Sequence, residues 1–316
     1  MKDKIPVIDC DIHQTYTCHN ELLPYIDEPY KSRVKRGGFG YPGGMYHSSV
    51  GGVRKDAFPD DGVPGSDYEL MKTQHLDKFN IKYAVLNGGG MLGISLMTEQ
   101  DYPAVLAQAY NSWLIDTWLT YDERFLGSMM VAAQNPEAAA KEIYRVGDHK
   151  QIVQVLLSGV TPMPIGQRYY NPIFEACNEL GLPIAFHPGG NQSSGTAPVP
   201  TPVGFPQYYL EWHTLLPNVY MSQLVSIVVE GVLEKYKNLQ FIFIEGGVSW
   251  LPALMWRLDK NYKGLRKQTP WLKRLPSEYI LEGVKLTTQP MEEPPKKEYL
   301  LNMYEMIDAQ NTLLFS

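Results

Sequence analysis

Short apolar runs alternate with helical segments along most of the chain. The apolar runs predict eight strands, near residues 6–13, 83–87, 126–131, 152–157, 183–187, 241–244, 284–289 and 312–316. The segments between them predict helices over 67–79, 101–121, 136–147, 171–180, 208–235, 251–263 and 295–308. Continuous apolar strands separated by helices indicate a parallel sheet that is buried on both faces.

Two long stretches show neither the periodicity of a helix nor that of a strand. Residues 14–66 are rich in Gly, Pro and Tyr, and we interpret them as an irregular lid or insertion after the first strand. Residues 264–283 are expected to be irregular as well, and residues 190–206 form a Ser/Gly/Pro-rich loop. We expect the loops over 14–66 and 190–206 to shape a pocket.

Eight strand–helix units in a chain of 316 residues predict a (β/α)8 barrel, with residues 1–316 as a single domain. A doubly wound sheet is the alternative, because counting strands does not close a barrel. Polar residues at the strand ends favour the barrel, since a barrel gathers them on its carboxyl-terminal face. These residues are Asp11, His13, Asn87, His187, Glu245, Thr288 and Gln289.

Composition and charge narrow the class of protein. Hydrophobic residues make up 44% of the chain, enough for a large core, and no apolar run reaches the roughly 18–20 residues of a membrane helix. A net charge of −6 without a Lys/Arg cluster argues against nucleic-acid binding. The three cysteines form no CxxC pair, and residues 1–4 lead directly into a strand without a signal peptide. We therefore expect a cytoplasmic protein.

The strand-end residues suggest a metal site. Strand alternation puts Asp11 and His13 on one face, and His187 would complete a set of two histidines and one carboxylate. Such a set is typical of catalytic zinc, manganese or non-haem iron. An acidic side chain after an apolar strand is costly unless it is hydrogen-bonded or bound to a metal ion. We therefore expect Glu245 to be a fourth ligand, an acid that hydrogen-bonds to a ligand, or a general base. The alternatives are turn-capping roles for Asp11, His13 and His187, and an ion pair of Glu245 with Arg257.

The other histidines carry less information. His213 falls on a helix after the 190–206 loop, where it either acts as an acid or base in the pocket or is an ordinary surface or core histidine. We expect the remaining ones to be solvated or structural: His19, His47, His75 and His149.

Three segments resemble one known family. They are residues 8–13 (IDCDIH), 183–190 (PIAFHPGG) and 243–252 (FIEGGVSWLP), with the run 171–177 (NPIFEAC) before the second. Together they resemble the amidohydrolase-related family of metal-dependent (β/α)8 barrels, which contains aminocarboxymuconate-semialdehyde and resorcylate decarboxylases. The resemblance implies that Asp11, His13 and His187 are metal ligands.

The sequence departs from that family in two places. Glu245 stands where the family often has a catalytic histidine. The family's last strand continues into Ser-Asp-Tyr-Pro-His, whose aspartate is a ligand and base, whereas the sequence ends at Phe315-Ser316. We therefore expect a barrel truncated after strand eight, without its final helix, with an exposed apolar surface that favours association.

These observations support three hypotheses. The first is a metal-dependent hydrolase or decarboxylase that acts on a small organic acid or amide, in which Glu245 or His213 moves protons. The second is a non-haem iron oxygenase on the same barrel. The third is a non-catalytic subunit that pairs with an active paralogue. The expected partners are a small-molecule substrate and either further copies of the chain or a related barrel subunit.

Overall fold

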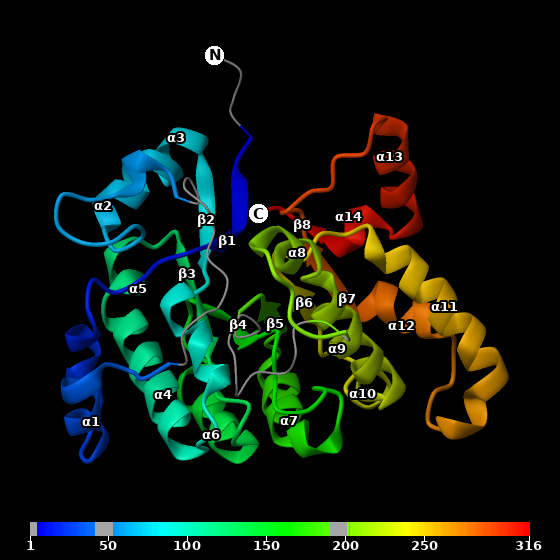
Figure 1. Ribbon diagram of the computed structural model, residues 1–316, viewed down its shortest axis with the longest axis horizontal. Helices are drawn as coiled ribbons and strands as arrows, with labels where there is room; N and C mark the ends of the chain where they lie inside the picture. Colours follow the sequence, from blue (N-terminus) through cyan, green and yellow to red (C-terminus); the bar gives the residue numbers. More distant parts are fainter. Residues whose placement is uncertain (1–4, 42–52, 190–200, 202) are drawn as a thin grey trace.

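Eight parallel strands form one sheet in the order of the chain (Figure 1). The computed structural model describes residues 5–41, 53–189, 201 and 203–316. The strands are β1 (Val7–Ile12), β2 (Ile81–Leu86), β3 (Phe125–Met130), β4 (Ile152–Ser158), β5 (Ile184–His187), β6 (Phe241–Phe243), β7 (Val284–Thr287) and β8 (Leu313–Leu314). Each strand pairs with the next in parallel, so the predicted strands and their direction are confirmed.

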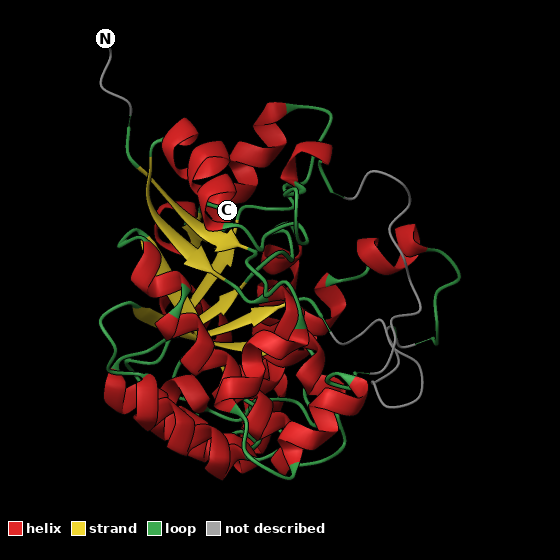
Figure 2. Ribbon diagram, turned by 90° about the vertical axis from the view of Figure 1, so that its left-hand side faces the viewer, coloured by secondary structure: helices red, strands yellow, loops and turns green. Residues whose placement is uncertain are grey.

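A main-chain hydrogen bond joins the first strand of the sheet to the end of the last. Cys10 N–H in β1 donates to the carbonyl of Phe315, directly after β8, at 2.9 Å. The sheet is therefore a nearly closed barrel, and Figure 2 shows its strands enclosed by helices. A doubly wound sheet would reverse its strand order at a switch point, so the unbroken order β1 to β8 rules it out.

Helices cover the outside of the barrel. The α-helices are α1 (Tyr30–Gly37), α2 (Tyr68–Met71), α3 (Asp77–Phe79), α4 (Asp101–Asp116), α5 (Trp118–Tyr121), α6 (Pro136–Val146), α7 (Asn171–Leu180), α8 (Tyr209–Thr214), α9 (Pro217–Val229), α10 (Val232–Lys235), α11 (Trp250–Leu265), α12 (Pro276–Gly283), α13 (Lys297–Met306) and α14 (Ala309–Thr312). A π-helical turn, η3 (Lys72–Leu76), joins α2 to α3. The 3₁₀ helices are η1 (His19–Tyr25), η2 (Lys55–Ala57), η4 (Gly89–Leu96), η5 (Arg168–Tyr170) and η6 (Arg266–Gln268). None of the helices in the described ranges combines the length and the apolar character needed to cross a membrane.

Several predicted helices are correct in position but broken. The helix expected over 101–121 divides at Thr117, whose hydroxyl donates to the carbonyl of Trp113 at 2.6 Å. The helix expected over 208–235 becomes α8, α9 and α10, because Pro217 starts a new helix and Gly231 has a positive φ of 76°. The prediction over 171–180 is confirmed to the residue.

The interpretation of 14–66 as irregular is wrong for part of the segment. The structure forms η1, α1 and η2 there, whereas residues 42–52 lie outside the described part of the chain. Glu21 explains η1, because its carboxylate accepts from the main-chain N–H of Thr17 and from Trp113 Nε1 on α4, at 2.6 and 3.2 Å. Such tertiary contacts stabilise short helices that have little periodicity of their own. The 190–206 loop falls mostly on residues outside the description.

The expectation of an irregular 264–283 is also wrong, since α12 occupies its second half. Pro276 opens this helix, and Glu278 accepts from the main-chain N–H of Leu275 at 2.7 Å. A proline in the first turn and an acid that caps the helix are local start signals.

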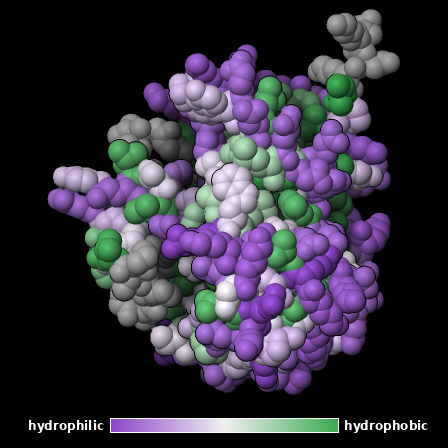
Figure 3. Space-filling model, turned by 90° about the vertical axis from the view of Figure 1, so that its right-hand side faces the viewer, coloured by the Kyte–Doolittle hydropathy of each residue, from purple (hydrophilic) through white to green (hydrophobic). Residues whose placement is uncertain are grey.

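The outer helices present polar surface. Helices α11 and α13 lie on the right-hand side of Figure 1, and Figure 3 shows that side as mostly hydrophilic, with scattered hydrophobic groups. The buried residues of α11 all lie in its amino-terminal half: Trp250, Leu251, Pro252 and Met255. Further along α11, Leu258 and Tyr262 are partly buried and also pack against the core.

Aromatic packing between neighbouring strands supports the core. Phe241 on β6 is fully buried, and its ring centroid lies 6.0 Å from that of Phe174 on α7 and 6.3 Å from that of Phe186 on β5. Side chains of this kind fill the space inside the barrel and between the barrel and its helices.

Truncation of Phe241 to alanine should therefore lower the free energy of unfolding by about 3–5 kcal/mol, because it leaves a cavity in the core. Phe58 is 55% exposed, so Phe58→Ala should change stability by no more than about 0.5 kcal/mol. Urea unfolding followed by circular dichroism measures both values. Equal losses for the two variants would contradict the assignment of the core.

Candidate metal centre

Three strands bring four metal-ligating side chains together. Asp11 and His13 come from the end of β1, His187 ends β5, and Glu245 lies two residues beyond β6. One ligand atom from each of the four lies within 4.8 Å of all the others. His187 Nε2 is 3.5 Å from Asp11 Oδ1 and 3.2 Å from Glu245 Oε2, and His13 Nε2 is 3.7 Å from Asp11 Oδ1. The sequence-predicted candidates for metal binding thus meet at the carboxyl-terminal face of the barrel.

An irregularity in β1 accompanies this arrangement. The register of β1 against β2 shifts between Asp9 and Ile12, and Asp9 Oδ1 accepts from the main-chain N–H of Asp11 at 3.1 Å. The second oxygen of Asp9 lies 2.9 Å from Nε2 of His75 in the π-helical turn η3. His75 is therefore structural, as the sequence suggested, and it holds the carboxylate that fixes the shift next to Asp11.

Hydrogen bonds orient both imidazoles. His13 Nδ1 lies 3.0 Å from the carbonyl oxygen of Asn87, and His187 Nδ1 lies 2.9 Å from the carbonyl oxygen of Pro188. A ring nitrogen next to a carbonyl oxygen carries the proton, so Nδ1 donates and Nε2 keeps its lone pair. Both histidines therefore turn a ligating nitrogen toward Asp11.

His187 Nε2 is the strongest sign of a metal ion. The side chain of His187 is 4% exposed, and this nitrogen is buried without a hydrogen-bond partner among the described residues. Buried polar atoms normally have a partner, and two carboxylates lie close to this one. Two imidazoles and two carboxylates form a donor set that suits manganese, zinc or iron. The residues present thus fit a divalent cation.

The charges of the cluster influence each other. Burial acts to lower the pKa of His187, but the carboxylates of Asp11 and Glu245 outweigh it, so that the pKa lies above its usual value. Burial acts to raise the pKa of Asp11, but the nearby imidazoles of His187 and His13 together with the amide of Asn87 outweigh it, and the pKa lies below its usual value. Asp11 is therefore ionised over a wide pH range, as a ligand must be.

Glu245 sits in a strained turn. Its φ is 58°, an uncommon value for a residue other than glycine, and its main-chain N–H donates to Thr287 Oγ1 at 3.0 Å. The next residue must be glycine, because a Cβ on Gly246 would lie 2.3 Å from the ring of Tyr220. Such strain concentrates at functional sites. Glu245 Oε2 faces His187 Nε2, and the described residues show no ion pair between Glu245 and Arg257, so that alternative is wrong.

His213 does not join the four-residue cluster. It is half-buried on α8, with its ring centroid 5.5 Å from that of Tyr209 and 6.1 Å from that of Trp212. Burial and, to a smaller extent, the charge of Glu245 raise the pKa of Tyr209, one helical turn before His213. A role of His213 in proton transfer stays a prediction.

Sequence reasoning missed a buried polar network beneath the ligands. Asn87 Nδ2 donates to Asp11 Oδ1 at 2.9 Å, and Asn87 Oδ1 accepts from Ser128 on β3 and from Gln154 on β4. All three polar side chains are buried. The available signal was a polar residue within each of the apolar runs 126–131 and 152–157.

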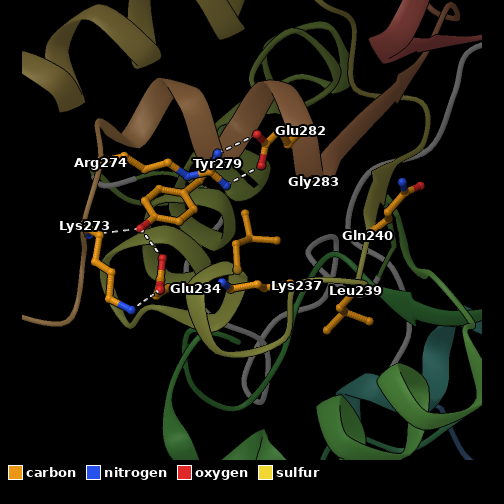
Figure 4. Close-up of a pocket in the computed structure, with 10 residues that line it drawn as sticks. Glu234, Lys237, Leu239, Gln240, Lys273, Arg274, Tyr279, Glu282 and Gly283 are labelled. Atoms are coloured by element: carbon orange, nitrogen blue, oxygen red, sulfur yellow. Dashed lines mark hydrogen bonds and ion pairs between the residues drawn. The ribbon is translucent and has the colours of Figure 1, made fainter.

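A separate hollow lies at the other end of the barrel (Figure 4). It has a volume of about 430 Å³ and is lined by residues before β6 and along α12. Four of its charged side chains form two ion pairs: Glu234 with Lys273 at 2.7 Å, and Arg274 with Glu282. The amino-terminal end of such barrels serves stability, so we do not assign the chemistry to this hollow.

The fold and the cluster define a (β/α)8 barrel with a candidate metal site at the carboxyl ends of its strands. The chain matches the family model described as Amidohydrolase over residues 8–303 and belongs to the amidohydrolase family. It is 25% identical over 166 residues to 2-amino-3-carboxymuconate-6-semialdehyde decarboxylase of Dictyostelium discoideum. This alignment covers 50% of the chain but only 42% of the relative. It is also 25% identical over 251 residues to gamma-resorcylate decarboxylase of a Polaromonas species, covering 72% of this chain and 73% of the relative.

Solved structures share the fold. The chain superimposes on 2,6-dihydroxybenzoate decarboxylase from Rhizobium with a TM-score of 0.67 and 17% identity, covering 98% of this chain and 87% of the other. It superimposes on 5-carboxyvanillate decarboxylase from Novosphingobium aromaticivorans with a TM-score of 0.68 and 20% identity, covering 98% of this chain and 85% of the other. That structure contains manganese and 4-hydroxy-3-methoxy-5-nitrobenzoic acid. The predicted resemblance and barrel are thus confirmed, with decarboxylases as the relatives.

Removal of the buried imidazole should abolish metal binding. We expect His187→Ala to lose the divalent metal that copurifies with the chain or is added as Mn²⁺, because the site loses the nitrogen that has no other partner. His149 lies in the turn before β4, away from the cluster, and its variant His149→Ala is the control. Metal analysis after gel filtration measures both. Full metal content in His187→Ala would contradict the site.

Metal affinity should fall as the pH decreases. With Nδ1 of His187 bonded to Pro188, an added proton must occupy Nε2, the atom assigned to the metal. Because the pKa of His187 lies above its usual value, protons begin to compete at a higher pH than for a free histidine. Below that pKa the Mn²⁺ affinity should drop roughly tenfold per pH unit, and binding should release a proton. Calorimetry in two buffers tests this, and a pH-independent affinity without proton release would contradict it.

Proposed function

We propose that this protein is a metal-dependent decarboxylase of small aromatic acids. Asp11, His13, His187 and Glu245 would hold one divalent ion, with manganese as the first candidate. The observation that carries the proposal is the buried, unbonded His187 Nε2 between two carboxylates at the carboxyl-terminal face of the barrel. Two kinds of comparison support it: the curated relatives are named decarboxylases, and solved neighbours contain manganese.

The four residues differ in exposure, and we assign their roles accordingly. When bound, a divalent ion supplies Lewis-acid polarisation of an oxygen atom and stabilises negative charge on it. Asp11 and His187 are buried and fixed by neighbours, so their task is to bind. The carboxylate of Glu245 is 34% exposed and can reach a substrate. We assign to the Glu245 oxygen that does not bind the ion the proton that replaces the carboxyl group on carbon, while the carboxyl group leaves as CO₂.

Hydrolysis of a small amide is the second candidate. The family is described as Amidohydrolase, and the same four residues would serve a hydrolase. The manganese in the solved neighbours favours either reaction over an iron-dependent oxygenase. Two expectations stay predictions: that the chain associates with itself or with a related barrel subunit, and that residues 1–316 form a single domain.

The decisive assay measures release of CO₂ from hydroxybenzoates by the Mn²⁺-loaded chain. We expect turnover that EDTA abolishes and Mn²⁺ restores. Glu245→Gln keeps the shape of the side chain but cannot carry the proton in the same way, so kcat should fall by about 10²–10⁴-fold. His213→Gln on α8 is the matched variant. A comparable fall in kcat for this variant would indicate that His213 transfers the proton. Hydrolysis of aryl amides without any CO₂ release would overturn the decarboxylase proposal in favour of the hydrolase.

A further inference from the structure

We infer that Asn87 is the positioning residue of the metal centre and orients both ligands that β1 supplies. This inference rests on the proposed metal site. Asn87 directly follows β2 and is fully buried next to the end of β1. It contacts Asp11 through its side chain and His13 through its main chain.

The side-chain amide orients Asp11. Asn87 Nδ2 donates to Asp11 Oδ1 at 2.9 Å and to the carbonyl of Cys10 at 3.1 Å. These two bonds use both hydrogens of the amide nitrogen. The carboxylate of Asp11 is thereby held at Oδ1, the oxygen that also faces His13 Nε2 and His187 Nε2. Partners of this kind orient ligands and tune metal affinity.

Two further strands hold the amide itself in place. Asn87 Oδ1 accepts from Ser128 Oγ at 2.5 Å and from Gln154 Nε2 at 3.0 Å, and Gln154 Nε2 also donates to Ser128 Oγ at 2.8 Å. Since Oδ1 receives two donors, the amide cannot turn over without losing them. A chain of buried polar groups therefore runs from β4 through β3 and β2 to the ligand on β1.

The main chain of Asn87 orients His13. Its carbonyl oxygen lies 3.0 Å from His13 Nδ1, and its N–H donates to the carbonyl of Ile12 at 2.8 Å. The next residue is Gly88, where a Cβ would lie 2.1 Å from the hydroxyl of Tyr110. Close packing at Gly88 fixes the peptide that carries the carbonyl. Both contacts to β1 thus depend on the same residue.

The chain offers matched controls for a test. Asn111 on α4 is also fully buried, and its Nδ2 also donates to a carbonyl, that of Met130, and to a carboxylate, that of Glu142, at 2.9 and 2.7 Å. Asn87→Leu and Asn111→Leu therefore remove the same kind of bonds in the core, but only the first touches the metal centre. Gln154→Leu and Gln151→Leu form a second pair, because Gln151 is buried and its side-chain Nε2 donates to the carbonyls of Leu119 and Phe125, away from the metal centre.

The experiment measures Mn²⁺ affinity by calorimetry and the visible absorption of the Co²⁺-loaded proteins. We expect Asn87→Leu to bind Mn²⁺ about 10- to 100-fold more weakly and to change the Co²⁺ bands. Gln154→Leu should change both in the same direction by less. Asn111→Leu and Gln151→Leu should keep the wild-type affinity and spectrum, although they lose stability.

Several outcomes separate this inference from the proposed function. If the wild-type chain binds no Mn²⁺, the metal site itself is wrong. If the wild type binds and folded Asn87→Leu keeps its affinity and Co²⁺ spectrum, the inference is overturned. Equal losses in the Asn87 and Asn111 variants would also overturn it, since the effect would then be general to the core. Should Asn87→Leu fail to fold, the pair Gln154→Leu and Gln151→Leu decides by the same criteria.

Discussion

The convergence of parallel strand ends is the constraint on which the rest of the structure depends. All eight strands run the same way, and Cys10 in β1 bonds to Phe315 after β8, so every carboxyl end meets at one face. Asp11 and Glu245 are far apart in the chain, yet their ligand atoms lie within 4.8 Å of those of both histidines. Helices between the strands make this geometry possible, because parallel strands need a crossover.

The side chains of Asp11 and His187 are almost fully buried, and a buried carboxylate and imidazole are costly unless they are hydrogen-bonded or bind a cation. The protein offsets part of that cost by hydrogen bonds that also fix directions: Asn87 to Asp11, and carbonyl oxygens to the Nδ1 atoms of His13 and His187. The strained turn at Glu245 is tied to β7 through Thr287. Ligand orientation is therefore built into the strands and the loops that directly follow them.

The sequence allowed the strands and the four cluster residues to be predicted, because both follow from local patterns. Apolar runs mark buried strands, and polar residues such as His187 and Glu245 directly after them mark the strand ends. Helices η1 and α12 were missed because contacts with distant residues or their capping groups stabilise them more than their own periodicity does. Ser128 and Gln154 were missed since their partner Asn87 lies on another strand, and a pairing across three strands leaves no spacing signal in the chain.

Asp11, His13, His187 and Glu245 lie close enough together to hold one divalent ion. The most direct measurement is X-ray diffraction from crystals of the Mn²⁺-soaked protein, collected on both sides of the manganese absorption edge. We expect one strong anomalous peak within ligand distance of His187 Nε2 and of carboxylate oxygens from both Asp11 and Glu245. A peak bound by other residues, or no peak at this cluster in Mn²⁺-saturated crystals, would contradict it.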